Sequence, residues 1–221
     1  MNGEISKNVL KSGTSIVGIV CKDGVVMGAD RRSTAGGGGA SIIMGKNKLK
    51  IRNVSDRVIA AYTGSVADLE LSNKVLAAEL RLKELKTRSK STIREAANLL
   101  AMMTYRNIRS PSMIPSIVGT LIAGVDEDGK VELYTIEPAG SASQVEDFDA
   151  NFSSGMPYIL GLMERQYRKD MSVKDAVELA KECLKSSMAR DTGSGNGIDV
   201  FSITKDGILH VVSEELIAQF K

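Results

Sequence analysis

The chain has 221 residues, of which 43% are hydrophobic and 25% are charged. This is an ordinary globular mixture, which excludes an intrinsically disordered or low-complexity protein, and the length suits one large domain. The 29 Lys and Arg residues nearly balance the 27 Asp and Glu residues, so the formal charge of +2 gives nucleic acid little to bind.

The cysteines, the histidine and the lengths of the apolar runs exclude further classes of protein. Cys21 and Cys183 lie far apart and form no CxxC pair, which suits a reducing cytoplasm, and both are expected in the core. One histidine, His210, leaves little material for a Ser-His-Asp triad or a histidine metal site. No stretch reaches the roughly 18 apolar residues of a membrane span. We expect a cytoplasmic protein that uses no metal or organic cofactor and contacts no membrane.

Strands dominate the first part of the chain. β-Branched runs separated by turn residues predict a hairpin and then a second pair of strands. These strands are expected at 14–20 and 25–29, with a turn at 22–24, and at about 50–51 and 58–64. The four glycines at positions 36–39 predict a loop between the pairs.

Helical spacing and further hairpins alternate in the rest of the chain. The first helix is expected at about 68–86, with apolar Leu69, Val75, Leu76, Leu80 and Leu82. The others are expected at 92–108, behind a Thr92–Glu95 capping box, at about 157–167, and at 173–188 behind Ser172 as N-cap. Hairpins are expected at 116–124 with 131–136, and at 198–203 with 208–212.

This order of elements predicts an α+β fold. Hairpins build antiparallel sheets because they do not supply the crossovers of a parallel sheet. The most economical packing is two antiparallel sheets face to face between outer layers of helices.

Two glycine-rich runs do not predict a phosphate site. The spacing GxxxxGK[ST] around Gly45-Lys46 would require Ala40 as its first glycine and Asn47 as its Ser or Thr. The run Gly193 to Gly197 misses the dinucleotide pattern and precedes a predicted strand where a helix is required.

The candidate nucleophile is Thr14, at the start of the first strand. A threonine hydroxyl needs a base, and its own α-amine can serve if the bond after Gly13 is cut. An α-amine titrates near about 8, and a nearby Lys50 cation, held by Asp30, would favour its neutral form. Each residue also has a purely structural interpretation: packing for Thr14, a turn for Asp30 and a solvated surface for Lys50. The residues taken singly do not choose between these interpretations.

A resemblance to a family favours the catalytic interpretation. The sequence resembles β subunits of 20S proteasomes of the archaeal type, over essentially all of residues 14–221. The resemblance rests on Gly13 to Thr34, Lys50-Ile51, Thr63 to Asp68, Phe152 to Pro157, and Arg190 to Gly195.

The resemblance implies a fold and a set of roles. The fold would be the four-layer α/β/β/α sandwich of N-terminal-nucleophile hydrolases. Residues 1–13 would be a propeptide, cut between Gly13 and Thr14 by the chain itself, and 14–221 would be one catalytic domain. The catalytic set implied comprises Thr14, Asp30 and Lys50, the backbone N–H of Gly64 for the oxyanion, and Ser154, Asp191 and Ser194 around the amine. Substrate contacts implied are Ser33, Thr34 and Tyr62.

The resemblance also implies an activity and partners. The chain would be a threonine endopeptidase that degrades unfolded polypeptides inside stacked heptameric rings of α and β subunits. A regulatory ATPase would act through the α ring. Two alternatives stay open: a structural or conditionally active β subunit that needs a paralogue, and an N-terminal-nucleophile amidase for small molecules.

Two of the departures from the family pattern affect the choice of site residues. The glycines at 36–39 resemble an insertion, so Lys46, Lys48 and Lys50 compete for one role. Lys50 is preferred because it directly precedes a strand and keeps its spacing to Gly64. Tyr62 stands where the family lines its first specificity pocket, so a shallow pocket for small or medium side chains is expected, unless the ring turns away into neighbouring packing.

Overall fold

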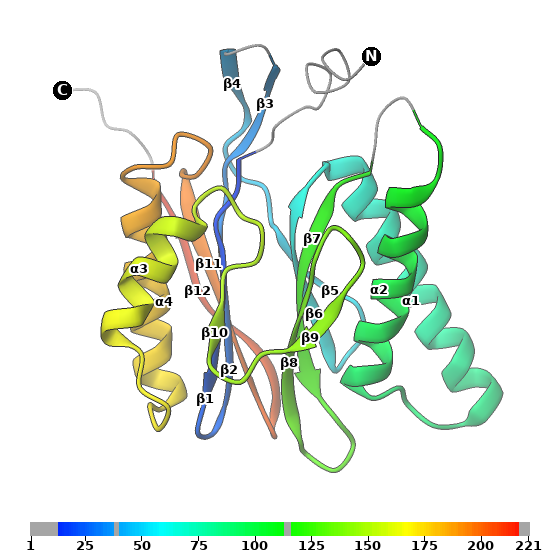
Figure 1. Ribbon diagram of the computed structural model, residues 1–221. Helices are drawn as coiled ribbons and strands as arrows, with labels where there is room; N and C mark the ends of the chain where they lie inside the picture. Colours follow the sequence, from blue (N-terminus) through cyan, green and yellow to red (C-terminus); the bar gives the residue numbers. More distant parts are fainter. Residues whose placement is uncertain (1–12, 38–39, 113–115, 217–221) are drawn as a thin grey trace.

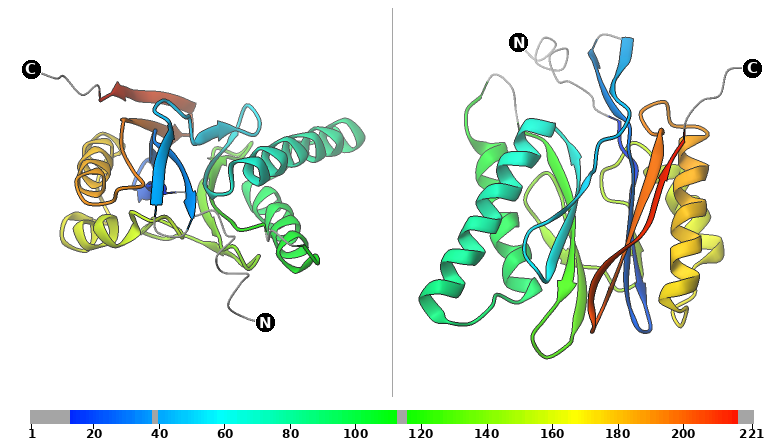
Figure 2. Two further views of the ribbon diagram at one scale, coloured as in Figure 1. Left: turned by 90° about the horizontal axis from the view of Figure 1, so that it is seen from above. Right: turned by 180° about the vertical axis from the view of Figure 1, so that it is seen from behind.

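Two five-stranded antiparallel sheets lie face to face between two pairs of helices in the computed structural model, which describes residues 13–37, 40–112 and 116–216 (Figure 1). One sheet has the order β10-β1-β2-β11-β12 and the other β5-β6-β7-β8-β9. Helices α3 and α4 cover the first sheet, and α1 and α2 cover the second (Figures 1 and 2). The predicted four-layer sandwich is confirmed.

The strands of the first sheet are β1 (Ile16–Cys21), β2 (Gly24–Asp30), β10 (Phe148–Asp149), β11 (Gly197–Thr204) and β12 (Gly207–Glu215). Those of the second are β5 (Ile51–Asn53), β6 (Val58–Gly64), β7 (Val118–Val125), β8 (Val131–Ile136) and β9 (Ala142–Gln144). The helices are α1 (Val66–Thr87), α2 (Ile93–Arg109), α3 (Met156–Gln166) and α4 (Val173–Met188). All four predicted helices and all three hairpins are confirmed, whereas the short strands β9 and β10 were not predicted.

Strand alternation produces three cores, because successive side chains point to opposite faces of a sheet. In β6, Ala60 and Tyr62 pack toward α1 and α2, while Ile59 and Ala61 pack between the sheets. The central strands of the sheets, such as β2 and β7, are therefore buried on both faces. The core under α3 and α4 contains Cys21 and Cys183, both unpaired and buried, as predicted.

The prediction of a loop at 36–39 is wrong where the structure describes this run. Gly36 and Gly37 end strand β3 (Ser33–Gly37), which pairs with β4 (Ala40–Gly45) in a separate hairpin. Positions 38–39 lie outside the described residues. The hairpin rises above the two sheets (Figures 1 and 2).

Three of the five apolar residues that predict α1 face the core. Leu69, Leu76 and Leu80 are buried, whereas Val75 and Leu82 are 37% and 43% exposed. The buried face is completed by Ser72, because positions 69, 72, 76 and 80 follow the helical repeat that Val75 and Leu82 break.

No helix among the described residues is long and apolar enough to span a membrane.

Candidate active site

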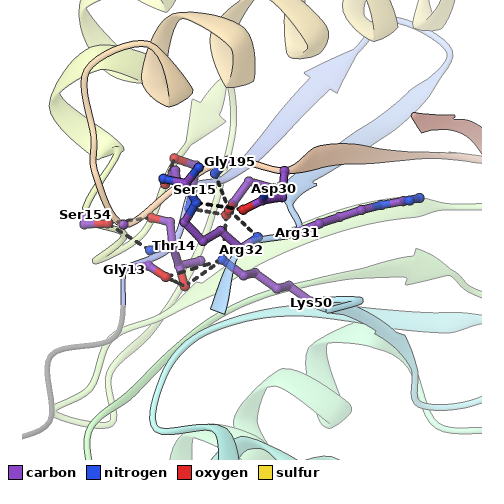
Figure 3. A network of polar contacts seen from close by, with 12 residues as sticks. Gly13, Thr14, Ser15, Asp30, Arg31, Arg32, Lys50, Ser154 and Gly195 are labelled. Atoms are coloured by element: carbon purple, nitrogen blue, oxygen red, sulfur yellow. Dashed lines mark hydrogen bonds and ion pairs between the residues drawn. The ribbon is translucent and has the colours of Figure 1, made fainter. Parts of the chain in front are cut away.

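Thr14 lies just before β1, at the top of the first sheet, and is 4% exposed. Its Oγ donates a hydrogen bond to the carbonyl oxygen of Gly13 at 2.7 Å (Figure 3). The chain is continuous through this bond, so the Thr14 nitrogen is an amide here. The nucleophile candidate therefore touches the carbonyl of the peptide bond that the sequence predicts to be cut.

Lys50 joins this pair from the neighbouring sheet, just before β5. Its Nζ lies 3.1 Å from Thr14 Oγ, 3.4 Å from the Gly13 oxygen and 2.6 Å from Asp30 Oδ1. Of the three competing lysines, Lys50 is thus the one that the structure brings to Thr14. Lys46 and Lys48 are exposed.

Asp30 ends β2 and is fully buried. The antiparallel register of β1 and β2 brings it beside Ser15, whose amide donates to Oδ1 at 2.8 Å. The amides of Arg32 and Gly195 each donate to Oδ2 at 2.9 Å. With the Lys50 ammonium on Oδ1, four donors hold this carboxylate, as buried charges require.

Burial lowers the pKa of Lys50, and the neighbouring Asp30 carboxylate opposes that shift. Desolvation disfavours a charged amine, while an opposite charge in contact favours it. Because burial is the larger effect, Lys50 gives up a proton more readily than a lysine in water.

Ser154, Asp191 and Ser194 meet on the other side of Thr14. Ser154 Oγ accepts from the Thr14 amide at 2.9 Å and donates to Asp191 Oδ2 at 2.6 Å. Ser194 Oγ donates to the same Oδ2, also at 2.6 Å. The polar side chains predicted around the Thr14 nitrogen thus come from two segments. Ser154 lies just before α3, and Asp191 and Ser194 lie in the loop after α4.

Sequence reasoning missed two further hydroxyls. Ser15 Oγ lies 2.7 Å from Ser194 Oγ and 2.6 Å from Ser187 Oγ of α4, and both Ser15 and Ser187 are fully buried. The carbonyl of Ser187 accepts from the Asp191 amide at 2.7 Å. Ser15 could have been suspected from its place beside Thr14, whereas no local pattern singles out Ser187.

Gly13 is required by a close backbone contact. A Cβ on Gly13 would lie 2.1 Å from the Cα of Gly193, and a Cβ on Gly193 would lie 2.4 Å from the Cα of Gly13. The Gly13 amide also donates to Thr34 Oγ at 2.9 Å. The two glycines and the Thr34 hydroxyl thus fix the Gly13–Thr14 peptide bond next to the Thr14 hydroxyl.

The remaining predicted residues surround a pocket next to Thr14. Ser33, Tyr62 and Gly64 line it together with Thr14 and Lys50. Gly64 ends β6 with φ +103°, a conformation that favours glycine, and a Cβ there would lie 2.0 Å from the Ile117 carbonyl oxygen. The Tyr62 ring turns toward α1, where its hydroxyl donates to Asn73 Oδ1 at 2.9 Å.

This arrangement can catalyse acyl transfer through the Thr14 hydroxyl. Lys50 is the basic group in contact with that hydroxyl, and polar side chains surround the Thr14 nitrogen. Within the described ranges, no cluster of three or more His, Cys, Asp or Glu residues is placed to hold a metal ion.

The family model and the most similar relatives point to the same protein family. The model of the proteasome subunit family matches residues 10–203. The proteasome subunit beta of Nanoarchaeum equitans is 38% identical over 195 residues, which cover 88% of this chain and 95% of that protein. Those of Archaeoglobus profundus and Methanothermobacter thermautotrophicus are 37% and 38% identical, over 98% and 96% of this chain and 95% of each relative.

Proposed function

The chain is a β subunit of the proteasome subunit family, and from that premise we propose that it works as a threonine-type endopeptidase. The observation that carries the proposal is the Thr14 hydroxyl, 2.7 Å from the Gly13 oxygen and 3.1 Å from Lys50 Nζ. A nucleophile, a basic group and a target carbonyl share one site.

In the proposed maturation, Thr14 Oγ attacks the Gly13 carbonyl carbon. The Gly13–Thr14 C–N bond breaks, an ester forms on Oγ, and the hydroxyl proton ends on the freed amine after passing through Lys50. Water then hydrolyses the ester, releasing residues 1–13 with a C-terminal carboxylate and restoring the hydroxyl. Residues 1–12 of this propeptide lie outside the described residues.

In the proposed turnover, the freed α-amine takes the proton from Thr14 Oγ as it attacks a substrate carbonyl. An acyl-enzyme forms, the amine product leaves with that proton, and water releases the acyl group. Ser154, Asp191 and Ser194 would hold the amine, and the Asp30–Lys50 pair would stabilise the charge that develops. Donation from the Gly64 backbone to the oxyanion remains a prediction.

The proposed setting is a particle of stacked heptameric rings, with α subunits, other β subunits and a regulatory ATPase that acts through the α ring. Unfolded polypeptides are the proposed substrates. The two unpaired, buried cysteines support a reducing cytoplasm. Against a purely structural subunit stands the assembled Thr14, Asp30 and Lys50 set, which ring packing alone does not need.

The test is the intact mass of the chain co-expressed with its α subunit. The wild type should lose 13 of its 221 residues, leaving 221 − 13 = 208, and hydrolyse peptides. Thr14→Ala should keep the full mass and have no activity, while Thr87→Ala, at the exposed end of α1, should behave as the wild type. The proposal would be contradicted if Thr14→Ala rings lost the 13 residues normally with no active β paralogue present.

A further inference from the structure

Ser154 is an exposed residue that nonetheless makes several short polar contacts beside Thr14 (Figure 3). Its Oγ accepts from the Thr14 amide at 2.9 Å, and it lies 3.0 Å from the Thr14 carbonyl oxygen and 2.6 Å from Asp191 Oδ2. Close packing holds buried side chains in one position, and an exposed side chain has less of it. The backbone on either side of Ser154 must therefore keep this hydroxyl at Thr14.

The backbone after Ser154 is held at the first sheet. The Gly155 amide donates to the Thr14 carbonyl oxygen at 3.2 Å. A Cβ on Gly155 would lie 2.0 Å from Ser15 Oγ and 2.1 Å from Ser187 Oγ. Gly155 thus fits closely against the start of β1 and against α4.

The backbone before this point is held at the second sheet, through the side chain of Asn151. Its Nδ2 donates to Thr135 Oγ1 at 2.8 Å and to the carbonyl oxygens of Thr120 and Ile136 at 3.1 Å each. Two N–H groups are therefore shared among three acceptors of β7 and β8. Its Oδ1 accepts from the Phe152 amide at 2.7 Å. Asn151 is 3% exposed, so its amide is a buried polar group with all its donors and its acceptor in use.

Two further features suit asparagine to position 151. Its backbone has φ +45°, in the left-handed region that asparagine adopts more readily than most residues. Its amide also lies directly against Gly119 of β7, where a Cβ would come within 2.0 Å of Oδ1. Asn151 and Gly119 therefore form a fitted pair.

The site itself is divided between the two sheets. Thr14 lies at the end of the first sheet, whereas Lys50 and Gly64 lie at the end of the second. The segment from Asn151 to Gly155 is bonded to both sheets. A shift of this segment would move its hydroxyl away from the Thr14 nitrogen.

We propose that Asn151 is a positioning residue for the reaction: its amide ties this segment to the second sheet and so keeps the Ser154 hydroxyl on the Thr14 nitrogen. The inference rests on the proposed function, which gives Ser154 the task of holding the amine that cleavage frees on Thr14.

The first test is an experimental structure of the assembled α–β particle that carries Asn151→Gly. Glycine keeps the left-handed backbone conformation available and removes the amide. Ser154 Oγ should lie more than about 3.5 Å from the Thr14 nitrogen, beyond hydrogen-bond distance, against 2.9 Å in the wild-type chain. This distance can be measured whether or not residues 1–13 have been removed. A Ser154 that keeps its wild-type position overturns the inference.

The second test is peptide hydrolysis by the same particles, with kcat expressed per processed subunit as counted by intact mass. Asn151→Gly should lower kcat at least about tenfold and leave KM within about twofold, because a misplaced Ser154 disturbs the reacting groups and not the binding of substrate. Asn151→Gly combined with Ser154→Ala should match Ser154→Ala alone within about twofold. Losses that multiply in the double variant overturn the inference, because Asn151 would then act independently of Ser154. A change in KM alone also overturns it.

Gly119→Ala disturbs the same amide from β7. Its methyl group would occupy the place of Oδ1, so it should lower kcat as Asn151→Gly does and add no loss to a particle that already carries Asn151→Gly. A Gly119→Ala particle with wild-type kcat contradicts the fitted pair and overturns the inference.

Arg88→Gly is the matched control, because it replaces another left-handed residue, at the exposed end of α1. It should leave kcat and the position of Ser154 unchanged. Failure of both Asn151→Gly and Gly119→Ala to assemble would assign Asn151 to folding and so overturn the inference. Hydrolysis that survives Thr14→Ala would instead contradict the proposed function.

Discussion

Lys50 carries its amine into a buried position between Asp30 and the Thr14 hydroxyl. Burial lowers its pKa below the ordinary 10.5, so more of it is neutral at a given pH than for a lysine in water. The neutral amine is the form that accepts the hydroxyl proton. The rate at which the precursor loses residues 1–13 should therefore rise with pH and level off below pH 10.5.

Intact mass against time after the precursor is mixed with α subunits, over a series of buffers, measures this rate. Lys50→Ala should abolish the loss at every pH, whereas Lys46→Ala, which changes an exposed lysine outside the site, should follow the wild-type profile. A rate that falls as pH rises would show that the charged amine is the active form.

At the residue scale, a local pattern predicts Asp30, whereas the distant Ser154, Asp191 and Ser194 were expected only from the family resemblance. Asp30 follows from the β1–β2 hairpin, whose register returns the chain to Ser15. Ser187 could not be predicted, because it lies 172 positions from Ser15 and belongs to a helix with an apolar stripe that already explains its buried face. The orientation of Tyr62 also needed the structure, since its partner Asn73 lies on another element.

At the element scale, α2 offers a clean test of capping. Thr92 accepts from the Glu95 amide, and the Glu95 carboxylate accepts from the Thr92 amide, so the predicted capping box is confirmed. Thr92→Ala should lower the free energy of unfolding by about 1 kcal/mol. The measurement is urea unfolding of the isolated precursor.

The adjacent Ser91 is the control for that test. Its Oγ is buried with no hydrogen-bond partner among the described residues. Ser91→Ala therefore removes a hydroxyl that gains nothing from folding, and it should be neutral or slightly stabilising. If both variants lose equal stability, the capping box is not what holds the start of α2.

Helices were predictable because caps and apolar spacing are local signals, whereas the β3–β4 hairpin was not. Both of its strands end in glycine, and Ile42, Ile43 and Met44 form a continuous apolar run with no alternation. All three side chains are exposed, so no core enforces a strand pattern there. A glycine run predicts a loop unless a partner strand is known.

At the scale of the whole molecule, exposed apolar side chains indicate surfaces that other subunits cover. On α1, Leu71 and Leu85 are 61% and 63% exposed, and on the β3–β4 hairpin Ile42 and Met44 are 63% and 65% exposed. Single exposed apolar residues are ordinary, but groups on one element are typical of contact surfaces. Family membership supplies the reason, since a proteasome subunit assembles with other subunits.

The isolated chain should accordingly remain an unprocessed precursor with little peptidase activity, and co-assembly with α subunits should raise both processing and activity. Light scattering, intact mass and peptide hydrolysis on the same sample test this. A processed, fully active monomer would be the contrary result.

The contact between Gly13 and Gly193 has a consequence for the mature subunit that we propose. The two backbones touch where neither tolerates a side chain. If residues 1–13 are removed as proposed, the backbone that lies against Gly193 leaves with them. The space it vacates lies beside Thr14 and is too narrow for a side chain directed at Gly193, but it has the width of a polypeptide backbone. The contact that fixes Gly13 in the precursor would thus become, in the mature subunit, a place for the backbone of a substrate.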